Sequence, residues 1–140
     1  MADIKTTSNL ITGQKVWLVD GNQMNRERLQ HSLSSQGYIV NSFEDIATAL
    51  KQAVQSDRFV LVTAEQLPDG YFGELISSLK NKQKIVTTIV TSLDGTIERA
   101  VDAFRHGAQD YLVEPYSSLE LNDVIQRALS KAKKQEELAA

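Results

Sequence analysis

Short apolar runs alternate with amphipathic segments along this chain. The runs are rich in β-branched and aromatic side chains, as buried strands tend to be. They cover residues 16–19, 38–40, 59–63, 85–91 and 111–113. The pattern therefore predicts five strands.

The segments between the runs carry apolar residues at helical spacing, which predicts a helix after each strand. Gly37 and Gly107 are good stops for the first and fourth helices. Ser42 is expected to cap the second helix, since Asp45 three residues later gives an acidic form of the capping box. The apolar stripes are Leu29 and Leu33; Ile46, Ala49, Leu50 and Val54; Phe72, Leu75, Ile76 and Leu79; Ile97, Ala100, Val101 and Phe104; and Leu121, Ile125, Ala128 and Ala132.

Five strands joined by helices predict an α/β fold with a parallel sheet that is buried on both faces and has right-handed crossovers. The expected architecture is a doubly wound five-stranded sheet of order 2-1-3-4-5 with five helices. Ligands of such folds bind at the carboxyl ends of the strands, near the point where the strand order reverses. The residues at those ends are Asp20, Gly21, Ala64, Thr91 and Glu114.

The composition fits one soluble domain. The chain has 140 residues, of which 41% are hydrophobic and 24% charged. Its net charge of −3 argues against a nucleic-acid partner, because phosphate contacts leave a basic footprint. The lack of cysteine excludes disulfides and cysteine-ligated zinc. Since no apolar run approaches the roughly 20 residues of a membrane span and no signal-peptide core is seen, we expect a cytoplasmic protein.

The residues at the strand ends lack part of the set that phosphoryl chemistry needs. An acyl-phosphate site requires a carboxylate nucleophile, a divalent cation on hard oxygen ligands, and a hydroxyl and an ammonium for the phosphate. Asp20 supplies one carboxylate and Thr91 a hydroxyl, but Ala64 offers a methyl group and Glu114 a second carboxylate. No cofactor is expected, and magnesium binding at Asp20 and Glu114 should be weak or absent.

Three segments in this order resemble the receiver domain of bacterial response regulators, the CheY-like family with its flavodoxin-like fold. They are Lys15–Asp20, Phe59–Gly70 and Gly107–Pro115, and the resemblance spans about residues 15–130. In that family an aspartate four residues before the proline of the second segment accepts the phosphoryl group. Four residues before Pro68 this chain has Ala64.

The resemblance implies a degenerate phosphorylation pocket. Receivers usually carry an acidic pair after the first strand, whereas here Asp20 is followed by Gly21. The lysine that usually precedes the proline of the third segment is replaced by Glu114. The hydroxyl position is kept as Thr91, and the switch aromatic as Tyr111. We interpret the chain as a pseudo-receiver and not as an enzyme.

Several of these side chains also fit purely structural roles. Asp20 suits a cap of the following helix, and Thr91 suits a bond to a backbone group. Glu114 fits solvent exposure, pairing with a Lys or Arg, or a weak cation site with Asp20. Glu65 follows the acceptor position, and strand alternation sends it to the opposite face, so it would matter only if the strand slipped by one residue.

Four other residues invite simpler interpretations. His31 and His106 lie on different helical segments, and a basic residue such as His106 is ordinary at a helix C-terminus. Neither is therefore expected to bind metal or phosphate. Trp17 is expected in the core, and Asp69 followed by Gly70 indicates a turn.

We expect three segments: a flexible N-terminal segment 1–14, a receiver-like domain 15–130 and a helical extension 131–140. Good helix formers continue after Leu129 with no stop signal, which suggests a linker to an output domain. A frayed polar tail is the alternative.

Two functions remain in play. The first is a phosphorylation-independent signalling module of a two-component phosphorelay, linked to transcription regulation and acting through protein contacts. The second is a working receiver phosphorylated at a non-standard site. In the family the fourth helix, fifth strand and fifth helix carry dimer or output contacts, so we expect a homodimer or protein partner near 97–104, Tyr111 and 119–128. An effector domain could follow the chain, and no glycine-rich phosphate loop supports nucleotide binding.

Overall fold

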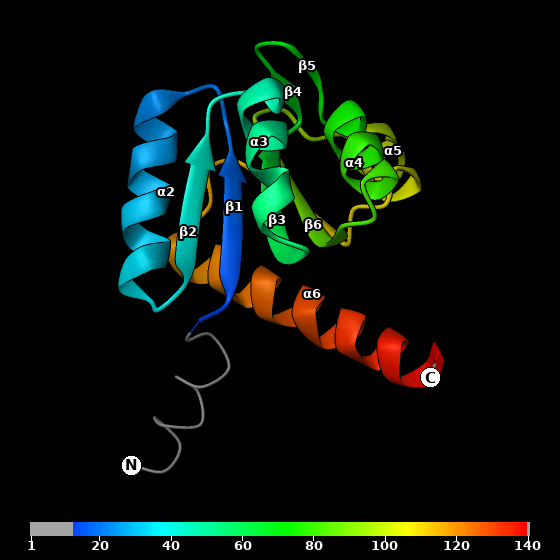
Figure 1. Cartoon of the computed structure of the whole chain (residues 1–140). Coiled ribbons are helices and arrows are strands. Elements are labelled where there is room, and N and C mark those ends of the chain that lie inside the picture. Colours follow the sequence, from blue (N-terminus) through cyan, green and yellow to red (C-terminus); the bar gives the residue numbers. More distant parts are fainter. Residues whose placement is uncertain (1–12, 140) are drawn as a thin grey trace.

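The computed structural model of the chain describes residues 13–139, apart from the side chains of Val54 and Ala139. Most of the predicted flexible segment 1–14 lies outside this range. Within it, strands and helices alternate as the hydrophobic pattern predicts (Figure 1). The main-sheet strands are β1 (Lys15–Val19), β2 (Ile39–Phe43), β3 (Arg58–Ala64), β6 (Ile85–Ser92) and β7 (Asp110–Val113), and the helices are α2 (Gln23–Ser35), α3 (Ile46–Gln52), α4 (Phe72–Asn81), α5 (Ile97–Arg105) and α6 (Ser118–Ala139).

The five main strands form one parallel sheet in the order β2-β1-β3-β6-β7, which confirms the predicted order 2-1-3-4-5. The register pairs Val16 of β1 with Val40 of β2 and with Val60 of β3. On the other side of β3, Ala64 pairs with Thr91 at the end of β6. Because all pairs are parallel, the carboxyl ends of the strands meet at one edge of the sheet.

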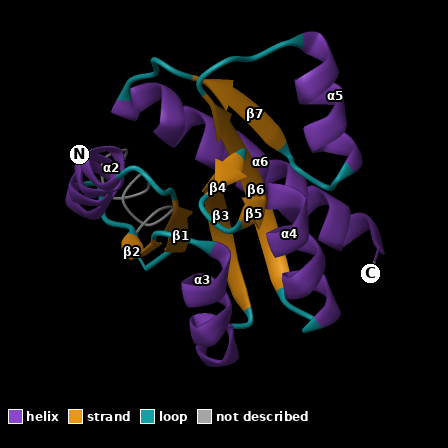
Figure 2. Cartoon of the chain, turned by 90° about the horizontal axis from the view of Figure 1, so that it is seen from above, coloured by secondary structure: helices purple, strands orange, loops and turns teal. Residues whose placement is uncertain are grey.

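Helices cover both faces of the sheet (Figure 2). On one face, Val16 and Leu18 of β1 pack in a core with residues of α2 and α6. On the other face, Trp17 and Val19 pack with residues of α3 and α4. Trp17 is 1% exposed and stacks on Phe59 with ring centroids 4.0 Å apart, which confirms its predicted place in the core. The continuous apolar run of β1 follows from burial on both faces.

The expected cap of the second helix was wrong. Ser42 lies inside β2, where it pairs with Leu18 of β1. The helix α3 is instead capped by Asp45, whose side chain accepts a hydrogen bond from the backbone N–H of Thr48. The short 3-10 helix η1 (Ala53–Gln55) follows α3, so the predicted apolar stripe runs from α3 into this turn.

The turn expected at Asp69 and Gly70 belongs to a small antiparallel hairpin that the hydrophobic pattern did not predict. Its strands are β4 (Gln66–Leu67) and β5 (Gly70–Tyr71). The Asp69 carboxylate reaches from this hairpin to the start of α3, where it accepts from the backbone N–H groups of Ile46 at 2.9 Å and Ala47 at 3.0 Å. These are donors that a helix leaves unpaired at its first turn, so Asp69 is a second cap of α3.

Two glycines end helices as predicted. Gly37 follows α2 with a φ of 107°, and Gly107 follows α5 with a φ of 104°. Both angles lie in the left-handed region, which glycine adopts without steric cost. His106 directly before Gly107 is the C-cap residue of α5, the ordinary position expected for it.

The apolar stripe of α5 faces outward. Ile97, Val101 and Phe104 are 82%, 41% and 49% exposed, and the buried residue of this helix is Ala103. These three side chains recur at helical spacing, so they lie on one side of α5. We call them the α5 stripe.

The last helix, α6, continues without interruption from Ser118 to Ala139. In its distal half, Glu136 forms an ion pair with Arg58 at the start of β3. The extension thus contacts the sheet domain, while its role as a linker stays a prediction. No helix among the described residues is both long and apolar enough to cross a membrane.

Candidate functional site

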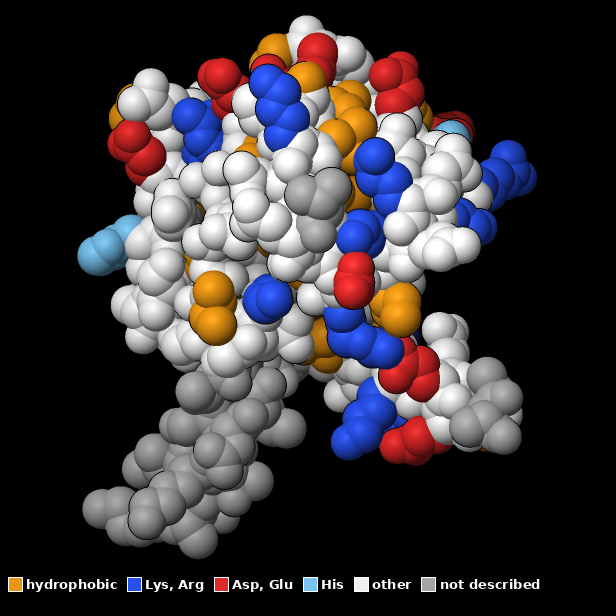
Figure 3. All heavy atoms as spheres, in the orientation of Figure 1, with side chains coloured by type: hydrophobic (Ala, Val, Ile, Leu, Met, Phe, Trp, Pro, Cys, Tyr) orange, Lys and Arg blue, Asp and Glu red, His pale blue; other side chains and the backbone are white. Residues whose placement is uncertain are grey.

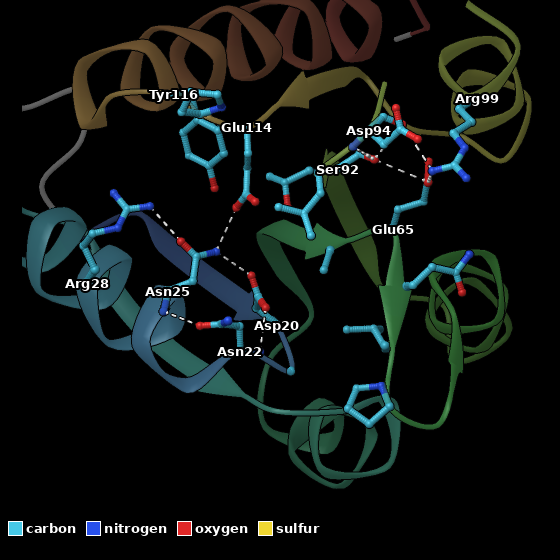
Figure 4. Close-up of a pocket in the computed structure, with 18 residues that line it drawn as sticks. Asp20, Asn22, Asn25, Arg28, Glu65, Ser92, Asp94, Arg99, Glu114 and Tyr116 are labelled. Atoms are coloured by element: carbon cyan, nitrogen blue, oxygen red, sulfur yellow. Dashed lines mark hydrogen bonds and ion pairs between the residues drawn. The ribbon is translucent and has the colours of Figure 1, made fainter. Parts of the chain in front are cut away.

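A cavity of about 1070 Å³ opens at the carboxyl edge of the sheet (Figure 4). All five residues predicted from the strand ends line it: Asp20, Gly21, Ala64, Thr91 and Glu114. The parallel sheet brings them together because their strands end at the same edge. Their role as a degenerate phosphorylation pocket stays a prediction.

One wall of the cavity holds two carboxylates joined by an amide. The Asn25 side-chain N–H₂ donates to Asp20 Oδ2 at 2.7 Å and to Glu114 Oε1 at 3.1 Å. Figure 4 shows the two carboxylates on either side of this amide. The Asn25 carbonyl oxygen in turn accepts from Arg28 at 2.7 Å. We call Asp20, Asn25 and Glu114 the acid–amide cluster.

Asp20 does not cap α2 as the structural interpretation expected. The N-cap is Asn22, whose side chain accepts from the backbone N–H of Asn25. Asp20 accepts from the backbone N–H of Asn22 at 2.8 Å, and Arg26 donates to the Asp20 carbonyl oxygen. Asp20 is 8% exposed, so its carboxylate is held at the cavity wall.

Glu114 fits none of its three expected roles in full. It is partly buried, and it forms no ion pair within 4 Å with any described Lys, Arg or His. Its observed partner is the neutral amide of Asn25, through which it is linked to Asp20. The expected neighbour Asp20 is thus present, with an N–H₂ group between the two acids.

The space beside Gly21, the predicted position of the missing second acid, is filled by Pro68. A Cβ atom at Gly21 would lie 2.9 Å from Pro68 Cγ and 3.0 Å from Pro68 Cδ. A side chain at this position would therefore require the Pro68 ring to move. The proline of the hairpin and the glycine after β1 fit together.

Ala64 and Thr91 pair at the ends of β3 and β6 and both line the cavity. Ala64 ends β3 and offers only a methyl group, and Thr91 is 4% exposed. The Thr91 hydroxyl donates to the Thr63 carbonyl oxygen over a long 3.5 Å. This contact is the backbone role considered for Thr91 from the sequence.

Glu65 lies at the cavity although the strand has not slipped, so the expectation that it would matter only after a slip was wrong. It is 6% exposed and lines the cavity together with Ala64. Its Oε1 accepts from Arg99 at 3.1 Å, and its Oε2 accepts from the Tyr111 hydroxyl at 2.8 Å. The Ser92 hydroxyl lies 3.5 Å from Oε1. We call these four residues the Glu65 cluster.

The Glu65 cluster holds the hydroxyl of Tyr111, whose role as a switch aromatic stays a prediction. Burial raises the pKa of Tyr111. The Glu65 carboxylate raises it further by accepting a hydrogen bond from the hydroxyl, while Ser92 opposes the shift. A raised pKa means that the neutral, hydrogen-bond-donating phenol is favoured. Tyr111 therefore donates to Glu65 at any pH near neutrality.

Tyr116 is a cavity residue that the sequence did not single out. Its ring packs in the core between the sheet, α2 and α6, and the residue is 7% exposed. Its hydroxyl is buried and has no partner of hydrogen-bond geometry among the described residues, although the Asn25 amide lies near enough to oppose the rise of its pKa. Burial and then the Glu114 charge raise the pKa of Tyr116 to about 12.

Neither His31 nor His106 lines this cavity. His31 is exposed on α2, and His106 contacts the Asp102 carbonyl oxygen one turn back on α5. Among residues 13–139, no group of three or more His, Cys, Asp or Glu side chains is placed to hold a metal ion. Figure 3 shows acidic and basic side chains intermixed over the face in view, without a single-sign patch.

The chain belongs to the response regulator receiver domain family, whose model matches residues 16–126. It is 30% identical over 124 residues to the DNA-binding transcriptional regulator NtrC of Rhizobium meliloti, covering 89% of this chain and 26% of NtrC. It is 28% identical over 118 residues to the transcriptional regulatory protein FixJ of the same species, covering 84% of this chain and 58% of FixJ. The chain thus spans about a quarter of NtrC and little more than half of FixJ.

A solved structure supports the same fold. The signal receiver domain of a putative Luxo repressor protein from Vibrio parahaemolyticus matches with a TM-score of 0.80 at 18% identity, covering 91% of this chain and 98% of that one. At this identity the likeness speaks for the fold alone. The predicted CheY-like architecture is confirmed.

Proposed function

We propose that this receiver domain signals without phosphorylation, through contacts with other proteins. The observation that carries the proposal is Ala64 at the end of β3, paired with Thr91 and lining the cavity. A methyl group cannot accept a phosphoryl group. The position that the family uses for the acceptor therefore has no nucleophile.

The surrounding residues support the same proposal. Family members hold a magnesium ion next to the acceptor. Magnesium takes hard oxygen ligands from carboxylates and water. Here Gly21 lacks the second carboxylate of the acidic pair, and the Asn25 N–H₂ group donates to the two carboxylates present at this wall, Asp20 and Glu114. A magnesium ion bound between these two carboxylates would have to displace the amide, so the residues present do not fit magnesium well.

Glu65 favours a second candidate, a receiver phosphorylated at a non-standard site. Its carboxylate lines the cavity one residue beyond the usual acceptor, near Ser92. To act as a nucleophile it would have to leave Arg99 and Tyr111, which hold its two oxygens. Because these bonds neutralise and orient the carboxylate, we rank this candidate second.

Treatment with acetyl phosphate and magnesium, followed by intact-mass measurement, tests both candidates. Phosphorylation-independent signalling predicts no added phosphoryl group, with a receiver that carries an acceptor aspartate as the positive control. A stoichiometric adduct on the wild type would overturn the first candidate. If that adduct disappeared in Glu65→Gln, the second candidate would be correct.

We further propose that the output surface is formed by α5, β7 and α6, in a homodimer or with a protein partner. Five large apolar side chains are exposed on α5, β7 and the first turn of α6: Ile97, Val101, Phe104, Val113 and Leu119. Exposed apolar groups gathered on one surface mark protein contacts more often than scattered ones do. By analogy with NtrC and FixJ, an effector domain following α6 would couple this surface to transcription in the cytoplasm.

A further inference from the structure

The cavity contains a buried polar group with no partner. The Tyr116 hydroxyl forms no hydrogen bond to the described residues, although the residue is 7% exposed. Figure 4 shows this hydroxyl pointing into the cavity beside the Glu114 carboxylate. Leaving such a group unpaired costs about 1 to 3 kcal/mol, so native structures rarely do so without a reason.

The lining of the cavity as a whole carries excess negative charge. The lining holds four carboxylates and two guanidinium groups, a formal excess of two negative charges. On the far wall Arg99 is paired with Glu65. Near the acid–amide cluster, Arg28 donates to the Asn25 carbonyl oxygen and Arg26 to a backbone carbonyl oxygen, so neither binds a carboxylate directly.

The geometry points to a ligand: we propose that this cavity binds a primary ammonium group carried on an apolar body. An ammonium has three N–H donors and no acceptor. The Asp20 carboxylate, the Glu114 carboxylate and the Tyr116 hydroxyl oxygen supply three acceptors on one wall. The rest of the ligand would lie against Leu67, Pro68 and Leu93, which also line the cavity.

An ammonium fits this wall better than a metal ion does. A divalent cation needs several hard oxygen ligands close together, whereas the Asn25 N–H₂ group lies between the two carboxylates. An ammonium can bind the free lone pairs of the same carboxylates without displacing the amide. Its charge would also offset the excess negative charge of the lining.

The ammonium could belong to a free amine or to a lysine side chain of another protein. The cavity volume of about 1070 Å³ admits either. Two probes separate these sources: n-hexylamine, and Nα-acetyl-lysine methylamide, which presents the same ammonium as a protein does. Tighter binding of the alkylamine assigns the site to free amines, and tighter binding of the lysine derivative assigns it to lysine side chains.

Titration of the full chain with each probe, followed by two-dimensional ¹H–¹⁵N NMR, tests the proposal. Binding of n-hexylamine is expected in the millimolar range, because so small a ligand has few atoms with which to contact the cavity. The largest shift should occur at the Asn25 side-chain N–H₂ resonance. The neutral isostere n-hexanol should bind about tenfold more weakly, since it lacks the charge.

Three variants sharpen the test. Tyr116→Phe keeps the ring and removes the acceptor, and Glu114→Lys places an ammonium of the chain's own at the site. Each should weaken n-hexylamine binding by about tenfold. The control Glu137→Lys changes the net charge equally at an exposed position of α6 and should leave binding unchanged.

Three results would overturn the proposal. One is equal binding of n-hexylamine and n-hexanol, which would show an apolar site only. Another is no shift at Asn25 with either amine. The third is unchanged binding in Glu114→Lys while that variant keeps the dispersed spectrum of a folded domain.

Discussion

Replacing Arg99 by glutamine would leave the Glu65 carboxylate in its buried position without its cation. The Glu65 side chain is 7% exposed, whereas that of Arg99 is 49% exposed. After the substitution, the remaining donors to Glu65 are the Tyr111 hydroxyl at 2.8 Å and the Ser92 hydroxyl at 3.5 Å. Glu65→Gln leaves the other charge, that of Arg99, without its ion-pair partner. Arg99 would still donate to the Asp94 carbonyl oxygen at 3.2 Å and would still contact solvent.

The two substitutions should therefore differ in cost. Two unit charges 3.1 Å apart attract by about 1.3 kcal/mol in bulk water and by about 5 kcal/mol at an effective dielectric constant of about 20. The half-exposed guanidinium puts the pair near the lower value, and we expect a coupling of about 1 kcal/mol. Arg99→Gln should cost about 2 kcal/mol, since it also leaves a charge poorly solvated. Glu65→Gln should lower the free energy of unfolding by less than about 1 kcal/mol, which is less than half the cost of Arg99→Gln.

Urea denaturation of the wild type, both single variants and the double variant measures this coupling as a double-mutant cycle. The chain has a single tryptophan, Trp17, which is 1% exposed, so its fluorescence reports unfolding of the core. Repeating the cycle in 1 M salt should reduce the coupling, because an exposed guanidinium is screened by ions.

The control is Arg127→Gln, which removes an exposed arginine of α6 and should change the free energy of unfolding by less than about 0.5 kcal/mol. If Arg99→Gln cost no more than this control, Glu65 would not depend on Arg99. If Glu65→Gln proved the costlier variant, the argument from the buried carboxylate would be wrong.

Four other outcomes are expected. Tyr116→Phe should raise the free energy of unfolding at pH 7 by up to about 1 kcal/mol in urea titrations, because it removes a buried hydroxyl without a partner; a loss of stability would show that the hydroxyl is paired. All four tyrosines have a raised pKa in the folded chain. Their contribution to stability is therefore complete below the pKa of an unfolded tyrosine, about 10, and is lost as the pH rises through the pKa values of the folded chain. Absorbance titration should therefore detect no phenolate below pH 10, and stability should decline above it. Asp69→Ala should cost about 1 to 2 kcal/mol by thermal denaturation, as loss of a cap does, and a neutral result would contradict its capping role. Phe104→Ser and Arg127→Glu should weaken self-association in sedimentation without unfolding the chain, and a strict monomer in all samples would leave only an unknown protein partner for this surface.

The strands of the sheet could be predicted because a strand that is buried on both faces appears in the sequence as a continuous apolar run. A run such as residues 16–19 is apolar throughout, and the glycines after two helices mark where those helices end. These signals act over a few residues, and here the tertiary context agrees with them. The order of the strands and the edge that carries the site followed from them.

Local signals failed where a partner far along the chain decided the outcome. Ser42 matches a capping box, but β2 extends past it because its register with β1 continues to Phe43. Asp69 caps a helix 22 or 23 residues earlier, which no spacing rule shows. The hydrophobic stripe of α5 predicted a helix correctly and said nothing about which side faces the sheet.

The candidate site was predicted from strand ends only, so side chains arriving from helices were missed. Asn25 reaches Glu114 across 89 positions, and Arg99 reaches Glu65 across 34 positions. Strand alternation did give a usable signal for Glu65, since it turns away from Ala64 and toward Ser92. The prediction for Glu65 failed because a side chain at a strand end can line the cavity from either face of the sheet.

The Glu65 cluster suggests how Tyr111 could be controlled if the domain signals without phosphorylation, as proposed. In this chain the Glu65 carboxylate accepts a hydrogen bond from the hydroxyl of Tyr111, the residue predicted at the position of the switch aromatic. A partner can shift such an equilibrium only by its difference in affinity for the two states. Arg99 lies at the start of α5 with half of its side chain exposed, next to the α5 stripe. A partner that bound there and competed for Arg99 would loosen Glu65, and a difference of about 1.4 kcal/mol would change the population of released Tyr111 tenfold. Relaxation-dispersion NMR should accordingly show little conformational exchange at Tyr111 in the isolated wild type and measurable exchange in Arg99→Gln. Equal exchange in both proteins would show that the conformation of Tyr111 is not coupled to the surface of α5.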